Sequence, residues 1–394
     1  MKILHIVPSY IPAHRYGGPI ESVHELNKGL VKNGVEVVVY TTNIDGSKVL
    51  NVPFDQAVDI DGVKVFYFPI TFRPWQYSYK LHCALEKNIQ DFDLVHITSI
   101  FLSISTLGAY YARKFNKPYI ISPRGSLMFE PMKKNEWKKK IYISLIEKRN
   151  LAGAEAVHFT VEKEKNDYLN LKLSLEKAII VSNSIDVRGF NIIARDNIEF
   201  RKKFKIAADK KVILFMGRLH KIKGLDTLIP AFARVLEKEQ NAVLVLAGPD
   251  ENNYKKEIDK MIIDYELQDG KNVIFTGMLV GDDKISAYRE SEVFVLPSYS
   301  ESFGMSVIEA MIMRLPVVVT KGVGVGIFIN KSRAGIVVDK NEDDLSEAIV
   351  LILKNKNLGK EMGERGKKMI EEEFSQEMVA KKFLKEYSVL IKKH

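Results

Sequence analysis

Two glutamates, Glu301 and Glu309, are the residues of this sequence whose type and spacing most invite a chemical interpretation. They lie in SEVFVLPSYSESFGMSVIEAMIM, residues 291–313, a pattern that predicts a buried strand, a loop and a helix beginning near Gly304. The helix is apolar nearly all round, so it is expected to be buried. A carboxylate in its middle destabilises the fold by several kcal/mol unless something pairs with it. We therefore expect a bonding partner for Glu309.

Glu301 lies in the loop just before that helix, where backbone N–H groups and the helix dipole favour an anion. An anionic ligand over the helix N-terminus would have Glu301 beside it. Helical side chains lean toward the N-terminus, so Glu309 could reach the far polar end of the same ligand. Without a ligand, Glu309 would instead pair with a neighbouring Arg or Lys, and Glu301 would be solvated.

A second polar loop, GRLHKIKG at residues 217–224, follows another predicted strand. Ligands of open α/β sheets bind beyond the carboxyl ends of the strands. Arg218 as a planar fork and Lys223 as a mobile point charge suit a diphosphate, and the flanking glycines let the backbone approach it. The alternative is a solvated basic loop.

Three further features follow strands of the first half of the chain. Gly17 and Gly18 precede a predicted helix and could donate backbone N–H groups to a phosphate or a sugar, although a plain helix-entry turn explains them equally well. Arg124, in Ser-Pro-Arg-Gly, and Asn183, in Asn-Ser-Ile-Asp, are expected to line the mouth of a cleft. The eight histidines have no metal-ligand spacing, so His5, His96 and His158 are interpreted as hydrogen-bonded core residues and no metal site is predicted.

Strand and helix patterns alternate along the chain, which predicts two doubly wound parallel sheets. We place an N-terminal domain at residues 1–190, a C-terminal domain at residues 191–372, and a final helix within residues 373–394 whose apolar face must dock on something. The first series of strands is expected at residues 2–7, 35–40, 63–68, 94–98, 119–122, 156–160 and 179–182. The second series is expected at residues 212–216, 243–247, 273–276, 293–296, 317–320 and 336–338.

Composition excludes several classes of protein. The 394 residues are 46% hydrophobic and 28% charged, with one cysteine, so no disulfide framework or cysteine-rich metal site is expected and a reducing cytoplasm suits the chain. No apolar run is long enough to span a membrane. The net charge is +9, and residues 131–149 alone contribute seven basic and two acidic side chains. No nucleic-acid motif accompanies this charge, so no nucleic-acid partner is expected.

The basic segment, residues 133–149, also predicts a helix that places Trp137, Ile141 and Leu145 on one face beside lysines. Such a face suits peripheral contact with an anionic membrane, at the inner face of the membrane for a cytoplasmic protein. The alternative is a helix docked on the domain with its lysines in solvent. If membrane contact were the function of the whole chain, the protein would be a basic membrane-surface module without catalytic activity.

Taken together, these motifs resemble the retaining GT-B glycosyltransferases of family 4, with a Ser-Pro-Arg-Gly form similar to bacterial exopolysaccharide and cell-surface enzymes. The matches occur in the expected order across nearly the whole chain. They are Gly17-Gly18, FDLVHI at residues 92–97, Asn183-x-Ile185-Asp186, GRL…KG at residues 217–224, and the E-x7-E pair with Phe303-Gly304 inside it. Two departures are Ser184, where relatives usually have Gly, and Arg124, where many have His.

The resemblance implies two Rossmann-like domains facing across a cleft, a nucleotide-sugar held mainly by the second domain, and a final helix that crosses back to the first. It implies that Glu309 binds the ribose and Glu301 the donor sugar, and that Arg218 and Lys223 clamp the diphosphate. The backbone of Phe303, Gly304 and Met305 would lie nearby, and Gly18 would approach from the other domain. A UDP-sugar is the favoured donor and GDP-mannose the next.

The reaction that the resemblance implies is transfer of a hexose to a hydroxyl of a glycan or lipid-linked acceptor, with no cofactor and no metal required. Glu301, Arg218 and Lys223 are the expected catalytic residues. A nucleotide-sugar epimerase on the same fold is the competing enzyme reading. The acceptor, the linkage and the oligomeric state stay open.

Overall fold

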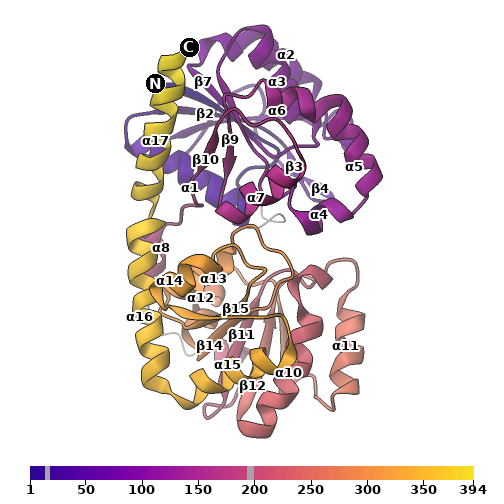
Figure 1. The fold of residues 1–394 in the computed structure, drawn as a ribbon, viewed down its shortest axis with the longest axis vertical. Coiled ribbons are helices and arrows are strands. Elements are labelled where there is room, and N and C mark those ends of the chain that lie inside the picture. The colour runs from indigo at the N-terminus through magenta and orange to yellow at the C-terminus, as the bar shows by residue number, and fades with distance from the viewer. Residues whose placement is uncertain (14–17, 193–198) are drawn as a thin grey trace. The chain divides into compact units, whose positions relative to one another are not determined.

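The computed structural model describes residues 1–13, 18–192 and 199–394, which form two compact units (Figure 1). Unit 1 contains Met1–Ile185 and Phe374–His394, and unit 2 contains Asp186–Glu373. The chain thus enters unit 2 five residues before the expected boundary after residue 190 and returns to unit 1 for its final helix. Each unit is built round a parallel sheet, as the alternating strand and helix patterns predict.

The sheet of unit 1 has eight strands in the order β10-β9-β8-β7-β1-β2-β6-β5. All pairs are parallel except β5 with β6. The order runs outward from β1 on both sides, which is the arrangement of a doubly wound sheet. The strands are β1 (Lys2–Val7), β2 (Glu36–Thr42), β5 (Val58–Ile60), β6 (Val63–Phe68), β7 (Leu94–Thr98), β8 (Tyr119–Ser122), β9 (Ala156–Phe159) and β10 (Ala178–Ile180), with a separate hairpin of β3 (Ile44–Asp45) and β4 (Lys48–Val49).

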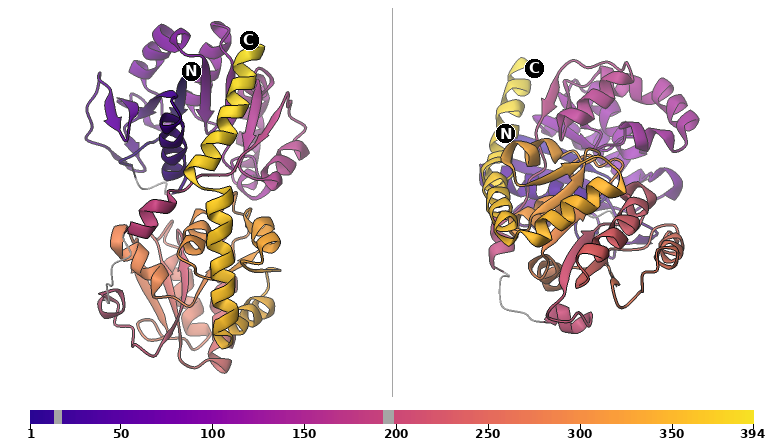
Figure 2. Two further views of the ribbon diagram at one scale, coloured as in Figure 1. Left: turned by 90° about the vertical axis from the view of Figure 1, so that its left-hand side faces the viewer. Right: turned by 60° about the horizontal axis from the view of Figure 1, so that its bottom comes forward.

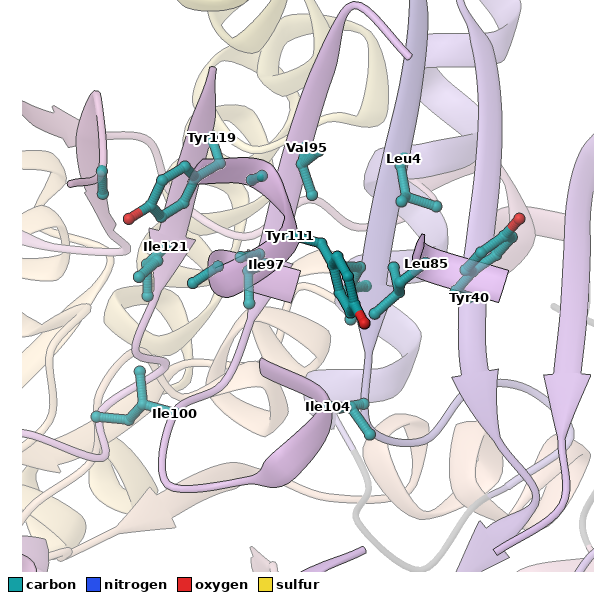
Figure 3. Close-up of a cluster of buried hydrophobic side chains, with 14 of the residues drawn as sticks. Leu4, Tyr40, Leu85, Val95, Ile97, Ile100, Ile104, Tyr111, Tyr119 and Ile121 are labelled. Atoms are coloured by element: carbon teal, nitrogen blue, oxygen red, sulfur yellow. The ribbon is translucent and has the colours of Figure 1, made fainter. Parts of the chain in front are cut away.

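Both faces of this sheet are buried, because successive side chains of a strand point to opposite faces. On one face Leu4 of β1 packs in a cluster with Leu85 and Ile104, from the helices α2 (Tyr79–Asn88) and α3 (Ser103–Lys114) (Figure 3). On the other face Ile3 of β1 packs with side chains of α1 (Gly18–Lys32) and α17 (Gln376–Lys393). The remaining helices of unit 1 are α4 (Phe129–Lys133), α5 (Glu136–Tyr142), α6 (Lys148–Ala152) and α7 (Glu162–Asn170).

The final helix, α17, runs beside α1 on unit 1 (Figure 2). Its side chains Val379, Phe383, Tyr387 and Leu390 are buried in the second core, and Ile391 packs against that core. A Cβ added at Gly29 of α1 would lie 2.9 Å from Gln376 Cγ, so the absence of a side chain lets the two helices approach closely. The apolar face at helical spacing therefore has its docking surface within unit 1.

The sheet of unit 2 has six parallel strands in the order β13-β12-β11-β14-β15-β16. The central strand β11 (Lys211–Met216) lies between β12 (Ala242–Ala247) and β14 (Val293–Leu296). The outer strands are β13 (Val273–Gly277), β15 (Val317–Thr320) and β16 (Gly335–Val338). The helices are α8 (Val187–Ile192), α9 (Glu199–Lys203), α10 (Leu225–Lys238), α11 (Lys255–Asp264), α12 (Gly281–Arg289), α13 (Met305–Ile312), α14 (Gly326–Ser332), α15 (Glu342–Lys354) and α16 (Lys356–Glu373).

Helix α10 packs against α15, and α13 packs against α16. Within the described ranges, no helix combines the length and apolarity needed to cross a bilayer.

Candidate active site

Two loops of unit 2 pack against each other beyond the carboxyl ends of neighbouring strands. Residues 217–224 follow β11 and residues 297–304 follow β14. The backbone N–H of Tyr299 donates a hydrogen bond to the carbonyl of Ile222 at 2.9 Å. Gly224 has a φ of +73°, and a Cβ there would lie 2.0 Å from the carbonyl oxygen of Pro297, so this close contact requires glycine. The two motifs that the sequence presents separately thus form one surface.

Lys223 and Glu301 form an ion pair across these loops. Their side chains are only 14% and 20% exposed. The backbone of Glu301 is also fixed, since its N–H donates to the carbonyl of Gly322 and its own carbonyl accepts from the N–H of Gly324. Glu301 is therefore held in place by a cation rather than solvated.

Helix α13 begins at Met305, four residues after Glu301, and Gly304 is its N-cap. This glycine has a φ of +103° and caps the helix, and its carbonyl accepts from the N–H groups of Val307 and Ile308. Phe303 buries its side chain in the core and accepts the N–H of Val325 with its carbonyl. The amides of a helix N-terminus point out along the axis, so the first turn of α13 can offer N–H donors to a ligand at this end of the helix.

Glu309 is buried within α13 and has two partners on α12. One carboxylate oxygen accepts from Lys284 Nζ and the other from the hydroxyl of Tyr288, both at 2.7 Å. Glu309 therefore has the bonding partner that its burial predicts. One of its partners is a lysine, as the alternative without a ligand predicts. An ionised carboxylate has about four lone-pair directions and can accept several donors at once. Lys284 and Tyr288 were not predicted, although their i,i+4 spacing places them on one face of α12.

Arg218 forms an ion pair with a different acid from Lys223. It is exposed, and its Nη1 lies 2.5 Å from a carboxylate oxygen of Glu251, in the loop after β12. The N–H of Leu219 donates to the carbonyl of Pro249 at 2.9 Å and joins these two loops. The two predicted diphosphate cations therefore lie at one edge of the sheet but contact different acids. An exposed ion pair contributes little to stability, so Arg218 can change partner at small cost.

In unit 1, Arg124 and Asn183 meet beyond the carboxyl ends of β8 and β10. The Nη1 of Arg124 donates a hydrogen bond to Oδ1 of Asn183. Arg124 has a φ of +52°, which is unusual for a residue other than glycine. Gly18 is the first residue of α1, whereas Gly17 lies outside the described residues.

The three strand histidines are buried and hydrogen-bonded, as expected for core residues. His96 bonds the hydroxyls of Tyr387 and Ser122, both at 2.7 Å, and His158 bonds Ser122 at 2.6 Å. Burial lowers the pKa of His5 and of His158 to about 3, so both are neutral near pH 7. Among the described residues, no group of His, Cys, Asp and Glu side chains is arranged to hold a metal ion.

Comparison with known proteins gives the family. Residues 196–369 match the model for glycosyl transferases group 1, and residues 16–188 match the model for glycosyltransferase family 4. The chain is a family 4 glycosyltransferase. The first match lies within unit 2, and the second covers most of unit 1 and ends three residues beyond it. The two units of this glycosyltransferase therefore both match the family.

Relatives match along the length of this glycosyltransferase. It is 27% identical to an uncharacterised glycosyltransferase of Methanocaldococcus jannaschii, over 99% of this chain and 98% of that protein. It is 26% identical to the alpha-monoglucosyldiacylglycerol synthase of Streptococcus pneumoniae, over 81% of this chain and 70% of that protein. The crystal structure of Anabaena HepE in complex with UDP and glucose has a TM-score of 0.76 at 16% identity, covering 99% of this chain and 100% of that one. The fold is therefore GT-B.

Proposed function

We propose that this glycosyltransferase moves a hexose from a nucleoside-diphosphate sugar to a hydroxyl of a glycan or lipid-linked acceptor, with retention of anomeric configuration. The observation that carries the proposal is the Lys223–Glu301 ion pair beside the N-terminus of α13. A cation and helix amides suit the diphosphate, and an adjacent carboxylate suits sugar hydroxyls. A UDP-sugar is favoured, since the similar HepE structure contains UDP and glucose, and GDP-mannose is the next candidate.

Each side chain then has a defined task. Negative charge develops on the leaving diphosphate, where Lys223, Arg218 and the α13 amides stabilise it without a metal ion. Glu301 orients the donor sugar, and the carboxylate of Glu309 accepts hydrogen bonds from the ribose hydroxyls. Retention follows from front-face attack, in which a donor phosphate oxygen takes the proton of the acceptor hydroxyl.

A thermal-shift panel tests the donor directly, because a ligand that binds the native state raises its apparent stability by mass action. UDP-, GDP- and ADP-sugars are compared with wild type and with Lys223→Ala. Lys221→Ala is the matched control, since Lys221 is an exposed lysine of the same loop. We expect the nucleotide-sugars of one base to raise the melting temperatures of wild type and Lys221→Ala more than that of Lys223→Ala. Equal melting temperatures with and without every nucleotide-sugar would remove it.

A nucleotide-sugar epimerase would use the same donor site, so the two reactions are separated by leaving out the acceptor. Incubation with donor alone followed by sugar analysis gives an epimer only if the enzyme is an epimerase. We expect unchanged donor sugar.

We further propose that residues 133–149 contact an anionic membrane surface. Trp137, Ile141 and Leu145 are 65%, 50% and 75% exposed, so these apolar side chains are not docked on unit 1. Phe129, on α4, is also largely exposed, and Lys133 Nζ lies 4.3 Å from the centre of its ring. Apolar and aromatic groups next to lysines are the composition of a helix that lies in a lipid interface.

The other side of this segment is anchored. A π-helical turn, Ile143–Glu147, follows α5 and buries Glu147, which accepts the N–H of Phe101 at 2.8 Å and the amide of Asn150 at 3.1 Å. Burial raises the pKa of Glu147. A fixed inner side lets the segment present its outer face rigidly. The similarity to an alpha-monoglucosyldiacylglycerol synthase supports a lipid acceptor at that face.

Vesicle flotation tests this surface. Wild type is expected to bind vesicles with 30% phosphatidylglycerol at low salt, and Trp137→Ser/Leu145→Ser to lose binding. Trp75→Ser is the matched control, because Trp75 is an equally exposed tryptophan outside the segment. No vesicle binding by wild type, or equal loss in the control, would contradict the membrane contact.

A further inference from the structure

Within the described part of the chain, no acid is bonded to the partly buried cation Arg124. Its hydrogen-bond partner there is the neutral side chain of Asn183. Its Nε is buried and has no hydrogen-bond partner, and among the residues that the structure describes Arg124 forms no ion pair. Burial lowers the pKa of this guanidinium to about 10. A buried charge without a counter-charge destabilises the native state.

The turn that carries Arg124 is held by Glu164 of α7. One carboxylate oxygen of Glu164 accepts the N–H of Gly125 at 2.5 Å, and the other accepts the N–H and the hydroxyl of Thr160 at 2.8 and 2.9 Å. The carboxylate of Glu164 therefore bonds Gly125 and Thr160, and it forms no hydrogen bond with the guanidinium of Arg124. The turn keeps left-handed φ angles of +52° at Arg124 and +78° at Gly125.

Glu164 supplies a negative charge that favours the protonated form of Arg124, although within the described part of the chain the two side chains form no ion pair. Burial lowers the pKa values of His5, His96 and His158, so these neighbours are neutral, and burial raises the pKa of Tyr387, which keeps its proton. The site lies directly after β8, at the carboxyl edge of the unit 1 sheet, where open α/β sheets bind ligands. A guanidinium at that edge whose Nε has no hydrogen-bond partner is complementary to a carboxylate or a phosphate.

We propose that Arg124 is the receptor for an anionic group of the substrate, a carboxylate or a phosphate, and that Glu164 is the positioning residue that holds the Arg124 turn. The inference rests on the proposed function, in which unit 1 contributes to substrate binding. Two sources supply the same chemistry: the carboxylate of a uronate on the donor, or a phosphate or carboxylate on the acceptor.

The first test is stability without any substrate. Removing an unpaired buried charge is expected to raise the melting temperature, so Arg124→Met should melt about 2–4 °C above wild type. Arg113→Met is the matched control, because Arg113 is a partly buried arginine of unit 1 whose Nη atoms bond Tyr119 and Asn150. That variant should melt below wild type. If Arg124→Met also melts below wild type, Arg124 is a structural residue and the inference is overturned.

The second test identifies the source of the anion. The donor arm compares UDP-glucuronate with UDP-glucose, and the acceptor arm compares octyl glucoside 6-phosphate with octyl glucoside. For the anionic member of one pair, the KM of wild type should be at least tenfold lower than the KM of Arg124→Met. For the neutral member of that pair, the two KM values should differ less than threefold. The kcat of Arg124→Met should equal that of wild type. Glu164→Gln should show the same KM pattern, and Glu162→Gln, an exposed acid of the same helix turn, should behave as wild type.

The outcomes separate the two proposals. If no nucleotide-sugar binds, the proposed function fails, and the melting-temperature comparison still decides whether Arg124 is an unpaired site. If nucleotide-sugars bind but wild type and Arg124→Met use neutral and anionic members alike, the anion receptor is wrong and the glycosyltransferase proposal stands.

Discussion

Lys223 and Glu301 form an ion pair that joins the loop after β11 to the loop after β14. Both side chains are largely buried, and their loops follow neighbouring strands of one parallel sheet. The pair holds a cation and a carboxylate next to the N-terminus of α13 before any ligand binds. A donor diphosphate would share Lys223 with Glu301, so the site requires little rearrangement to receive it.

Loss of Lys223 is expected to slow transfer. In Lys223→Ala the leaving diphosphate loses a buried donor, so kcat should fall by about 10²–10³-fold, as for removal of one preorganised donor from other active sites. Lys221→Ala should keep at least half of the wild-type rate. Steady-state rates with the best donor of the thermal-shift panel measure both. A wild-type kcat in Lys223→Ala would exclude Lys223 from the reaction.

Glu301→Gln separates orientation of the sugar from binding of the nucleotide. The amide keeps the shape but loses the charge that pairs with Lys223, so kcat should fall about 10–100-fold while the Kd for UDP changes less than about threefold. The control is Glu251→Gln, which removes the exposed partner of Arg218 and should change kcat less than about threefold. Equal effects on kcat and on UDP affinity would assign Glu301 to nucleotide binding instead.

Stability should depend on pH through the buried histidines. The pKa values of His5 and His158 are about 3 in the folded protein, against 6.5 for the ordinary side chain. Between these values the unfolded chain binds protons that the folded chain does not, so stability falls as pH drops from about 6.5 toward 3, by up to about 1.4 kcal/mol per pH unit for each histidine. Glu164, whose pKa burial raises, acts in the opposite direction, losing stability as pH rises above its ordinary value of 4.5.

Thermal melts of His158→Gln between pH 7 and pH 5 check this dependence. The variant should melt below wild type at pH 7, because it loses bonds to Ser122 and Val181, but its melting temperature should fall less steeply with pH. Parallel curves for the two proteins would show that His158 is not held neutral.

The strands were predictable because each is mostly apolar over four or more residues. Runs such as Leu94–Thr98 and Val293–Leu296 are buried on both faces of parallel sheets, and every predicted strand lies within two residues of its observed ends. The short elements β3, β4 and β5 were missed, because two or three residues with exposed Asp or Lys leave no apolar pattern. They form as short antiparallel hairpins, β3 with β4 and β5 with β6, rather than from an apolar run of their own.

The candidate site was predictable residue by residue but not contact by contact. Glu301 and Lys223 attract attention separately, yet they are 78 positions apart and nothing local indicates that they pair. Lys284 was missed because a charged residue in the first half of a helix is usually interpreted as a surface residue. Glu164 was missed for the same reason, since an acid in the first turn of a helix is explained by the helix dipole.

Calorimetric titration of UDP into wild type and Glu309→Ala tests the nucleotide-sugar site most directly. The ribose hydroxyls would lose a charged hydrogen-bond acceptor, so the Kd for UDP should rise about 10–100-fold in the variant. Lys284→Met is the control, because it breaks the ion pair with Glu309 and leaves the carboxylate in place; its Kd should stay within about threefold of wild type. A UDP site formed by Glu309 predicts this separation, and unchanged affinity in folded Glu309→Ala would contradict it.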